Sequence, residues 1–192
     1  MKKSDINSIF ARPRKLLLRP ETEWQAINRE NWEGIELFKN FLVPLSAISS
    51  VCAILLRFLS TSPLYAIGIG IILFVASVVG CYITYRIARE YLINKVPQAN
   101  RTVLHLAVYS SAVFIPFHCL SSGFSEGFLS QLMAICSLLC LRTLYVGLNR
   151  LTSLDAQYRK SALVIIGLLV IVSPIIIQQL LMIIFRIPTI YA

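Results

Sequence analysis

Long apolar stretches alternate with short polar links along this chain, and this pattern predicts its architecture. The clearest stretch runs from Leu64 to Tyr85 without a charged residue and is followed by Arg86, Arg89 and Lys95. About 20 apolar residues suffice for a helix to cross a bilayer. Similar stretches predict further spans at about 38–59, 103–120, 128–148 and 161–185. We therefore expect an all-α membrane protein, a bundle of five transmembrane helices.

Small residues recur along one side of the helix predicted at 64–85. They fall into two pairs spaced four apart, followed by a threonine: Ala66 and Gly70, Ala76 and Gly80, then Thr84. Small residues at this spacing let a second helix approach closely in lipid, where packing drives association. This row predicts a helix–helix interface.

The first 36 residues are polar and basic, which favours short amphipathic helices before the first span. We divide the chain into a cytoplasmic N-terminal segment, 1–36, and a membrane domain, 37–192. Apolar positions that include Phe10 fall on one face of the first helix, while Arg12, Arg14 and Lys15 occupy other faces. Cations beside an apolar face are typical of a helix that contacts anionic headgroups.

Trp24 follows Pro20, Glu21 and Glu23, a combination that favours a helix start. Trp24 is a candidate interfacial anchor, because tryptophan is enriched at membrane surfaces. The candidate membrane-surface contacts are therefore Phe10, Arg12, Arg14, Lys15 and Trp24. The alternative is a solvated helix that merely packs under the bundle.

Charge gives the expected orientation. The chain of 192 residues has a net charge of +9, is 57% hydrophobic and contains only 14% charged residues, which excludes an ordinary soluble domain. Lys and Arg gather in the N-terminal segment and in the links after the second and fourth spans, so the N-terminus is expected in the cytoplasm and the C-terminus outside. This rule explains the positive charge without a nucleic-acid partner.

Recognisable catalytic chemistry is lacking in the sequence. It contains no nucleophile elbow, phosphate-binding loop or metal-ligand cluster, and its five cysteines lie in or beside apolar spans. We expect no enzymatic activity, no cofactor and no metal. No Asp or Glu lies at mid-bilayer depth, which weighs against a proton- or cation-coupled transporter.

Arg142 is the charge within a predicted span that most needs an explanation. It lies seven or eight residues before the basic end of its helix, about 11 Å at 1.5 Å per residue. Tyr109 and Ser110 lie at a similar depth in the preceding span, so the three residues form a candidate intramembrane polar lock. Alternatively, the Arg142 side chain extends to the inner headgroups.

Other polar residues lie near the outer ends of the spans. Arg57 can extend outward along its own aliphatic stem. Gln178 and Gln179 can bridge helices or subunits, or they can lie in the headgroup layer.

Five short motifs follow one another along the chain: Arg19-Pro20-Glu21-Thr22-Glu23-Trp24, Ile27-Asn28-Arg29-Glu30, Phe41-Leu42-Val43-Pro44-Leu45, Val108-Tyr109-Ser110-Ser111 and Leu144-Tyr145-Val146-Gly147-Leu148. In this order and spacing, they resemble the bacterial members of the Yip (Ypt/Rab-interacting protein) family of five-span membrane proteins. Family members often follow the third-span tyrosine with a Thr-Pro pair. Here Ala112-Val113 stands in its place and proline comes only at Pro116, so any kink is expected to be displaced.

The resemblance implies a fold rather than an activity. Eukaryotic relatives are linked to Rab GTPases and vesicle traffic, and the bacterial likeness implies the inner (cytoplasmic) membrane. Together with the absent catalytic motifs, it favours a non-enzymatic scaffold or adaptor that organises partner membrane proteins or lipids. The partners expected are the bilayer with its anionic headgroups, and a membrane protein or further copies of the chain. The alternative is a small transporter or channel for a neutral or lipid-like substrate.

Overall fold

The computed structural model describes residues 6–29, 34–96, 98–124 and 127–186, and in these ranges it contains helices and no strand. The elements are α1 (Ile6–Leu18), α2 (Pro20–Arg29), α3 (Gly34–Leu37), the π-helix η1 (Phe38–Leu42), α4 (Val43–Arg57), α5 (Pro63–Leu92), α6 (Ala99–Gly123), α7 (Phe128–Ser137), α8 (Leu139–Leu151) and α9 (Ala156–Ile184).

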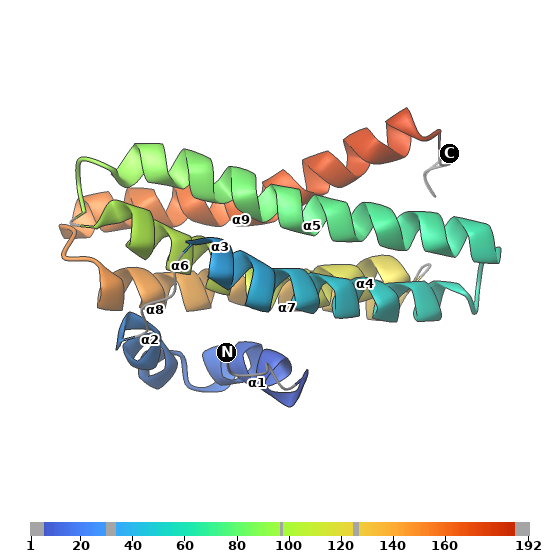
Figure 1. The fold of residues 1–192 in the computed structure, drawn as a ribbon, viewed down its shortest axis with the longest axis horizontal. Coiled ribbons are helices and arrows are strands. Elements are labelled where there is room, and N and C mark those ends of the chain that lie inside the picture. Colours follow the sequence, from blue (N-terminus) through green and yellow to red (C-terminus); the bar gives the residue numbers. More distant parts are fainter. Residues whose placement is uncertain (1–5, 30–33, 97, 125–126, 187–192) are drawn as a thin grey trace.

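Five helical stretches in the described ranges are long and apolar enough to cross a membrane. They are Phe38–Arg57, Pro63–Leu92, Ala99–Gly123, Phe128–Leu151 and Ala156–Ile184. Each overlaps one of the predicted spans, with ends that differ by a few residues. The all-α, five-helix membrane architecture is therefore confirmed, and the short helices α1 and α2 precede it (Figure 1).

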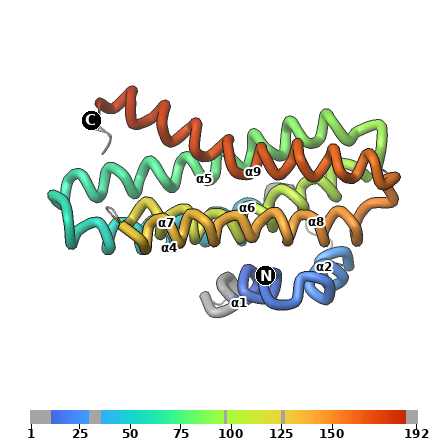
Figure 2. The backbone as a smooth tube through the Cα atoms, turned by 180° about the vertical axis from the view of Figure 1, so that it is seen from behind, coloured from blue at the N-terminus to red at the C-terminus, as the bar shows by residue number. Residues whose placement is uncertain are grey.

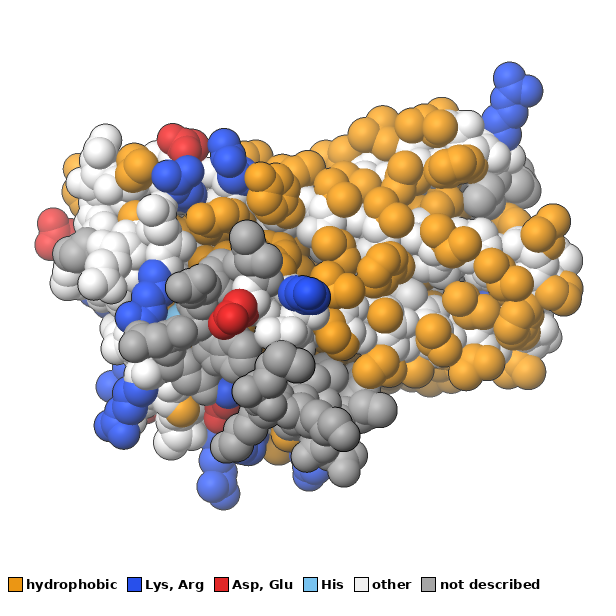
Figure 3. Space-filling model, in the orientation of Figure 1, with side chains coloured by type: hydrophobic (Ala, Val, Ile, Leu, Met, Phe, Trp, Pro, Cys, Tyr) orange, Lys and Arg blue, Asp and Glu red, His pale blue; other side chains and the backbone are white. Residues whose placement is uncertain are grey.

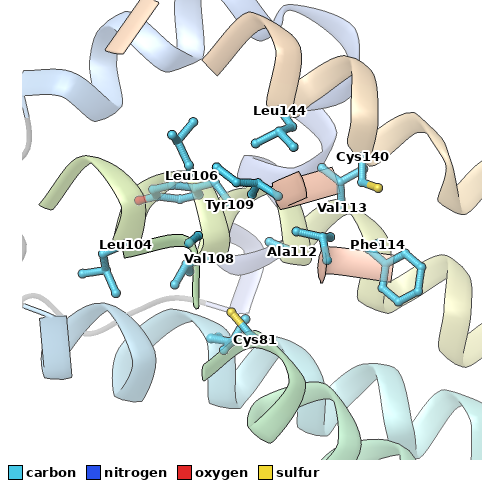
Figure 4. Close-up of a cluster of buried hydrophobic side chains, with 14 of the residues drawn as sticks. Cys81, Leu104, Leu106, Val108, Tyr109, Ala112, Val113, Phe114, Cys140 and Leu144 are labelled. Carbon is cyan, nitrogen blue, oxygen red and sulfur yellow. The ribbon is translucent and has the colours of Figure 1, made fainter. Parts of the chain in front are cut away.

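Helix α6 is the centre of the bundle. In its most apolar window 78% of the residues are buried, against 33–50% in the other four. It packs against α4, α5, α7 and α8, and Figure 2 shows it running through the middle of the bundle from behind. In Figure 4, Tyr109 and Leu106 of α6 lie toward Leu144 of α8, whereas Val108 lies toward Cys81 of α5. This helix therefore lies at the centre of the hydrophobic core.

The small-residue row of α5 forms the predicted interface. Its five residues are all buried, and α5 makes its most extensive contact with α9. A methyl group added at Gly80 would lie 2.7 Å from Cγ of Pro174 in α9. The hydroxyl of Thr84 donates a hydrogen bond of 3.0 Å to the carbonyl of Leu169. Close approach and a polar contact together join the two helices.

Two spans are irregular for local reasons. Pro44 cannot donate to the carbonyl four residues earlier, and the preceding turn widens into η1, where the Val43 N–H donates to the carbonyl of Phe38. The fourth span is divided between α7 and α8 at Leu138. There the Ser137 hydroxyl donates to the carbonyl of Ala134 at 2.6 Å and competes with the regular helix pattern.

Helix α9 bends at an internal proline. Pro174 lies inside the helix, and the C-terminal half of α9 turns away from the rest of the bundle in Figure 1. Exposed apolar side chains line this half, including Ile176, Leu180 and Ile183. We call residues 175–184 the α9 arm.

The surface separates into two zones. On the face drawn in Figure 3, basic and acidic side chains gather at the end where α1 and α2 pack, and a broad apolar surface covers the rest of the bundle. This distribution is that of a multi-pass membrane protein with one strongly charged end.

Candidate functional site

Helix α2 is docked against the bundle by its tryptophan. Pro20 begins the helix, and Glu21 and Glu23 lie in its first turn, as the sequence suggests. Trp24 and Ile27 are fully buried. The Trp24 Nε1–H donates a hydrogen bond of 3.0 Å to the carbonyl of Thr143 in α8. The docking thus satisfies the one polar group of the indole.

The expectation that Trp24 contacts the membrane surface is wrong. Its ring lies against Gly147 of α8, where an added methyl group would lie 2.6 Å from Cζ2 of the indole. A glycine at this place lets the ring lie directly on the α8 backbone. The alternative reading, in which α2 packs onto the bundle, is the one that the structure shows for this residue.

Tyr109 lies at the meeting point of α1, α2, η1 and α6. It is fully buried, and its hydroxyl accepts a hydrogen bond of 2.6 Å from Nη1 of Arg12. The Trp24 ring meets it edge-on with centroids 5.9 Å apart, and the Phe41 ring lies at 5.2 Å. The charged hydrogen bond and the two ring contacts fix α1 and α2 to the middle of α6. We call Arg12, Trp24, Phe41 and Tyr109 the docking cluster.

Arg142 does not belong to this cluster. It is exposed, and within the described part of the chain it forms no hydrogen bond or ion pair. Cys140, Thr143, Leu144 and Gly147 form the buried face of α8, which places Arg142 on the opposite side of the helix. The lock among Arg142, Tyr109 and Ser110 is not formed, since Arg12 takes the place predicted for Arg142.

The other candidate surface residues differ among themselves. Arg14 and Lys15 are exposed and line a cavity of about 520 Å³ between α1 and α2, together with Arg19, Thr22 and Glu23. Arg12 is half-buried in the docking cluster. Phe10 lies in α1, but its side chain falls outside the described part of the structure. On α1, therefore, Arg14 and Lys15 are exposed, whereas Arg12 is partly buried in the docking cluster.

Buried serines line the contacts among α4, α5 and α6. The hydroxyls of Ser46 and Ser50 on α4, Ser77 on α5, and Ser110 and Ser111 on α6 meet no hydrogen-bond acceptor or donor at ordinary geometry within the described residues. The Cys119 thiol lies beside Ser50 and Ser77. Hydroxyl groups are therefore buried at several places inside the bundle, and we call these five serines the serine seam.

Arg57 is buried, which corrects the expectation that it extends outward. Only 2% of it is exposed. Its Nη1 donates to the carbonyl of Ser122 in α6 at 3.2 Å, and its guanidinium carbon lies 5.8 Å from the ring centre of Tyr65 in α5. The cation therefore holds together the C-terminal ends of α4 and α6 and the N-terminal end of α5. The length of the arginine side chain alone did not indicate this, because the carbonyl that accepts its hydrogen bond belongs to a neighbouring helix.

The two glutamines of α9 have different surroundings. The Gln178 Oε1 lies 2.8 Å from Nε2 of His118 in α6, so Gln178 bridges two helices. Gln179 is exposed on the α9 arm and forms no hydrogen bond with another described residue. One side chain completes the bundle and the other faces away from it.

A comparison with known families identifies the domain. The family model of the Yip1 domain matches residues 14–178. The chain belongs to the Yip1 domain family. The resemblance predicted from the five motifs is therefore confirmed. No curated protein and no solved structure matches the chain.

The Yip1 match includes the docked helix as well as the bundle. It begins at Arg14 in α1 and reaches Gln178 in α9. The docking cluster and the serine seam lie within this Yip1 domain, apart from Arg12. Among the described residues, no group of three or more His, Cys, Asp and Glu side chains is arranged to hold a metal ion.

Proposed function

We propose that this Yip1-domain protein is a non-enzymatic scaffold that holds a partner membrane protein through the α9 arm. The observation that supports this most directly is the exposed amide of Gln179 on the α9 arm, where the other exposed side chains are apolar and the helix turns away from the bundle. Gln179 precedes the end of α9 by five residues, about 8 Å. An amide at this depth is stabilised by a hydrogen bond to another transmembrane helix.

Co-purification in mild detergent tests the scaffold. A stoichiometric membrane protein, or a second copy of the chain, is expected with the native protein. Gln179→Leu should lower the recovered partner about threefold, since a hydrogen bond between membrane helices contributes about 0.6 kcal/mol on average. Val164→Leu, on the exposed face of the inner half of α9, is the matched control and should recover the native amount.

Equal recovery with both variants would remove the α9 arm from the interface. Recovery of the chain alone as a monomer would contradict the scaffold itself.

The serine seam favours a second candidate function, a small transporter or channel for a neutral or lipid-like substrate. Unpaired hydroxyls can exchange hydrogen bonds with water or with a polar, uncharged solute. Flux of such a solute into liposomes that contain only the purified protein would support it. Ser50→Ala with Ser77→Ala should then slow the flux, and Ser161→Ala, an exposed serine of α9, should not.

We place the N-terminus in the cytoplasm, the C-terminus outside, and the protein in the bacterial inner membrane. The positive charges of the N-terminal segment and of the links after α5 and α8 support this orientation. Arg14 and Lys15, exposed on α1, are then available to anionic headgroups of the inner leaflet.

A further inference from the structure

A groove opens on the side of the bundle between η1 and α5, separate from the docking cluster and the α9 arm. It measures about 470 Å³ and is lined by Phe38, Lys39, Val43, Val78, Tyr82 and Tyr85. Leu104 of α6, only 4% exposed, adds to its apolar lining. Figure 1 shows α4 and α5 side by side along this face. The volume lies in the range of small-molecule sites, about 300–1,000 Å³.

The groove has one apolar end and one polar end. Val43 and Val78 lie farther along their helices from the charged end, and both are half-buried. Lys39 lies at the other end, where it is exposed and unpaired with any described acid. The side chains of Val78 and Tyr85 are seven residues apart on α5, about 10 Å along its axis. One leaflet of the hydrocarbon core is about 15 Å thick, so the groove extends through most of a leaflet.

The polar end carries further groups suited to an anion. Arg86 follows Tyr82 by four residues, so it lies on the same face of α5, one turn closer to the charged end. It is exposed and has no hydrogen-bond or ion-pair partner among the described residues. The hydroxyls of Tyr82 and Tyr85 are likewise unbonded to described residues. Two cations and two hydroxyls therefore lie near the mouth of an apolar groove.

The backbone beside the groove is irregular. The wide π-turn of η1 carries Phe38 and Lys39, and its position follows from Pro44. Phe38 meets Tyr82 edge-on with ring centres 6.4 Å apart, which closes one side of the groove. Such π-turns are frequent at functional sites. Here the turn sets the Lys39 side chain beside aromatic walls rather than over the bundle core.

We propose that this groove binds one anionic phospholipid, with an acyl chain against Val43 and Val78 and the headgroup phosphate between Lys39 and Arg86. The apolar part lies on membrane-spanning helices, so the molecule that reaches it is a lipid, and the cations select a negative headgroup. None of the lining residues belongs to α9, so the inference does not rest on the scaffold proposal.

Native mass spectrometry of the full-length protein, released from detergent after incubation with lipid, tests the proposal. Phosphatidylglycerol should remain bound at one molecule per chain and about fivefold more tightly than phosphatidylcholine. Lys39→Gln or Arg86→Gln should lower the affinity for phosphatidylglycerol about fivefold, which corresponds to about 1 kcal/mol per basic residue. Lys160→Gln, at an exposed lysine of α9, is the matched control and should leave it unchanged.

A second pair of variants tests the apolar end. Val78→Trp fills the groove and should abolish the retained lipid, whereas Val79→Trp, at the neighbouring exposed position, should not. A photoactivatable phosphatidylglycerol should also label the native α5 between Val78 and Tyr85, a result that does not depend on how any variant folds.

Equal retention of both lipids, or equal losses in Lys39→Gln and Lys160→Gln, would overturn the anionic selectivity. Labelling confined to other helices, or full retention by Val78→Trp, would overturn the location. Failure of the Gln179 experiment would leave both of these results standing.

Discussion

At the scale of residues, the docking cluster turns a surface arginine into a structural one. A guanidinium that meets a buried tyrosine hydroxyl exchanges water for a charged hydrogen bond, which contributes about 1.5–3 kcal/mol where it is formed fully. The same contact explains why Tyr109 tolerates complete burial. Arg12 thereby joins an N-terminal helix to the centre of the membrane domain.

A double-mutant cycle on thermal stability in detergent tests this contact. Arg12→Gln and Tyr109→Phe should each destabilise the protein, and the double variant should lose less than their sum, with a coupling of about 1.5 kcal/mol. The cycle of Arg142→Gln with Tyr109→Phe is the control. It should be additive within about 0.5 kcal/mol, because Arg142 lies on the far face of α8. Coupling in the Arg142 cycle alone would restore the lock that the structure lacks.

The sequence contained the information needed to place Arg142. Cys140, Leu144 and Leu148 recur at helical spacing, and Thr143 and Gly147 extend the same face. This periodicity puts position 142 outward. Depth along a span shows which residues can be level with each other, but only the helical face shows which can meet. Arg12 was not predictable as the partner of Tyr109, since the two residues are 97 positions apart.

At the scale of elements, the best-predicted feature is the small-residue row of α5. Glycine and alanine spacing reports directly on how closely two backbones can approach, so the interface follows from local sequence. The partner of each residue does not. Gly70 faces Ile54 of α4, whereas Gly80 faces Pro174 of α9. The row therefore packs against two different helices, and its spacing alone did not show which residue contacts which helix.

Gly80→Ala should destabilise the protein by about 1–3 kcal/mol, the usual cost of overpacking. The added methyl group would lie within 3 Å of the backbone and ring of Pro174, which cannot move aside as a flexible side chain can. Val79→Ala, at the exposed neighbouring position, should change the melting temperature in detergent little. Equal melting temperatures for Gly80→Ala and the native protein would mean that α5 and α9 are packed more loosely than described.

The irregular elements could be predicted only in part. The bend at Pro174 could be predicted, because a proline inside a long helix removes one backbone hydrogen bond and clashes with the preceding turn. Pro44 instead produces a π-turn before itself, and no proline marks the break at Leu138. Both have local causes, but a proline near the start of a helix and a serine inside one each permit an irregular turn without requiring it, so the residue type alone did not predict either.

At the scale of the whole molecule, the charged end and the apolar belt fix how the bundle can be placed in a bilayer. The links after α5 and α8 lie at the same end of the bundle as α2, and the link between α4 and α5 lies at the other end in Figure 1. Successive links lie at alternate ends of the bundle because each span crosses it once. Hydropathy and the charge of the links were therefore enough to predict which links share an end. How the N-terminal helices sit on this scaffold was not predictable, since their docking surfaces come from distant segments.

Two serines test the orientation with matched substitutions. Ser62, before α5, and Ser153, before α9, are both exposed, and they lie in links at opposite ends. In a chain whose five cysteines are replaced, Ser62→Cys should react with a membrane-impermeant thiol reagent in intact cells. Ser153→Cys should react only after the cells are opened. The reverse pattern would place the N-terminus outside.

The docking of α2 onto α8 joins residues that are 119 positions apart, Trp24 and Thr143. A ribosome releases the N-terminus first, so α1 and α2 emerge well before the helices that receive them. Their indole and arginine contacts can form only once α6 and α8 have been inserted. Closure of the N-terminal helices is therefore a late event of biogenesis, and a docked Trp24 marks a chain whose first four spans are in place.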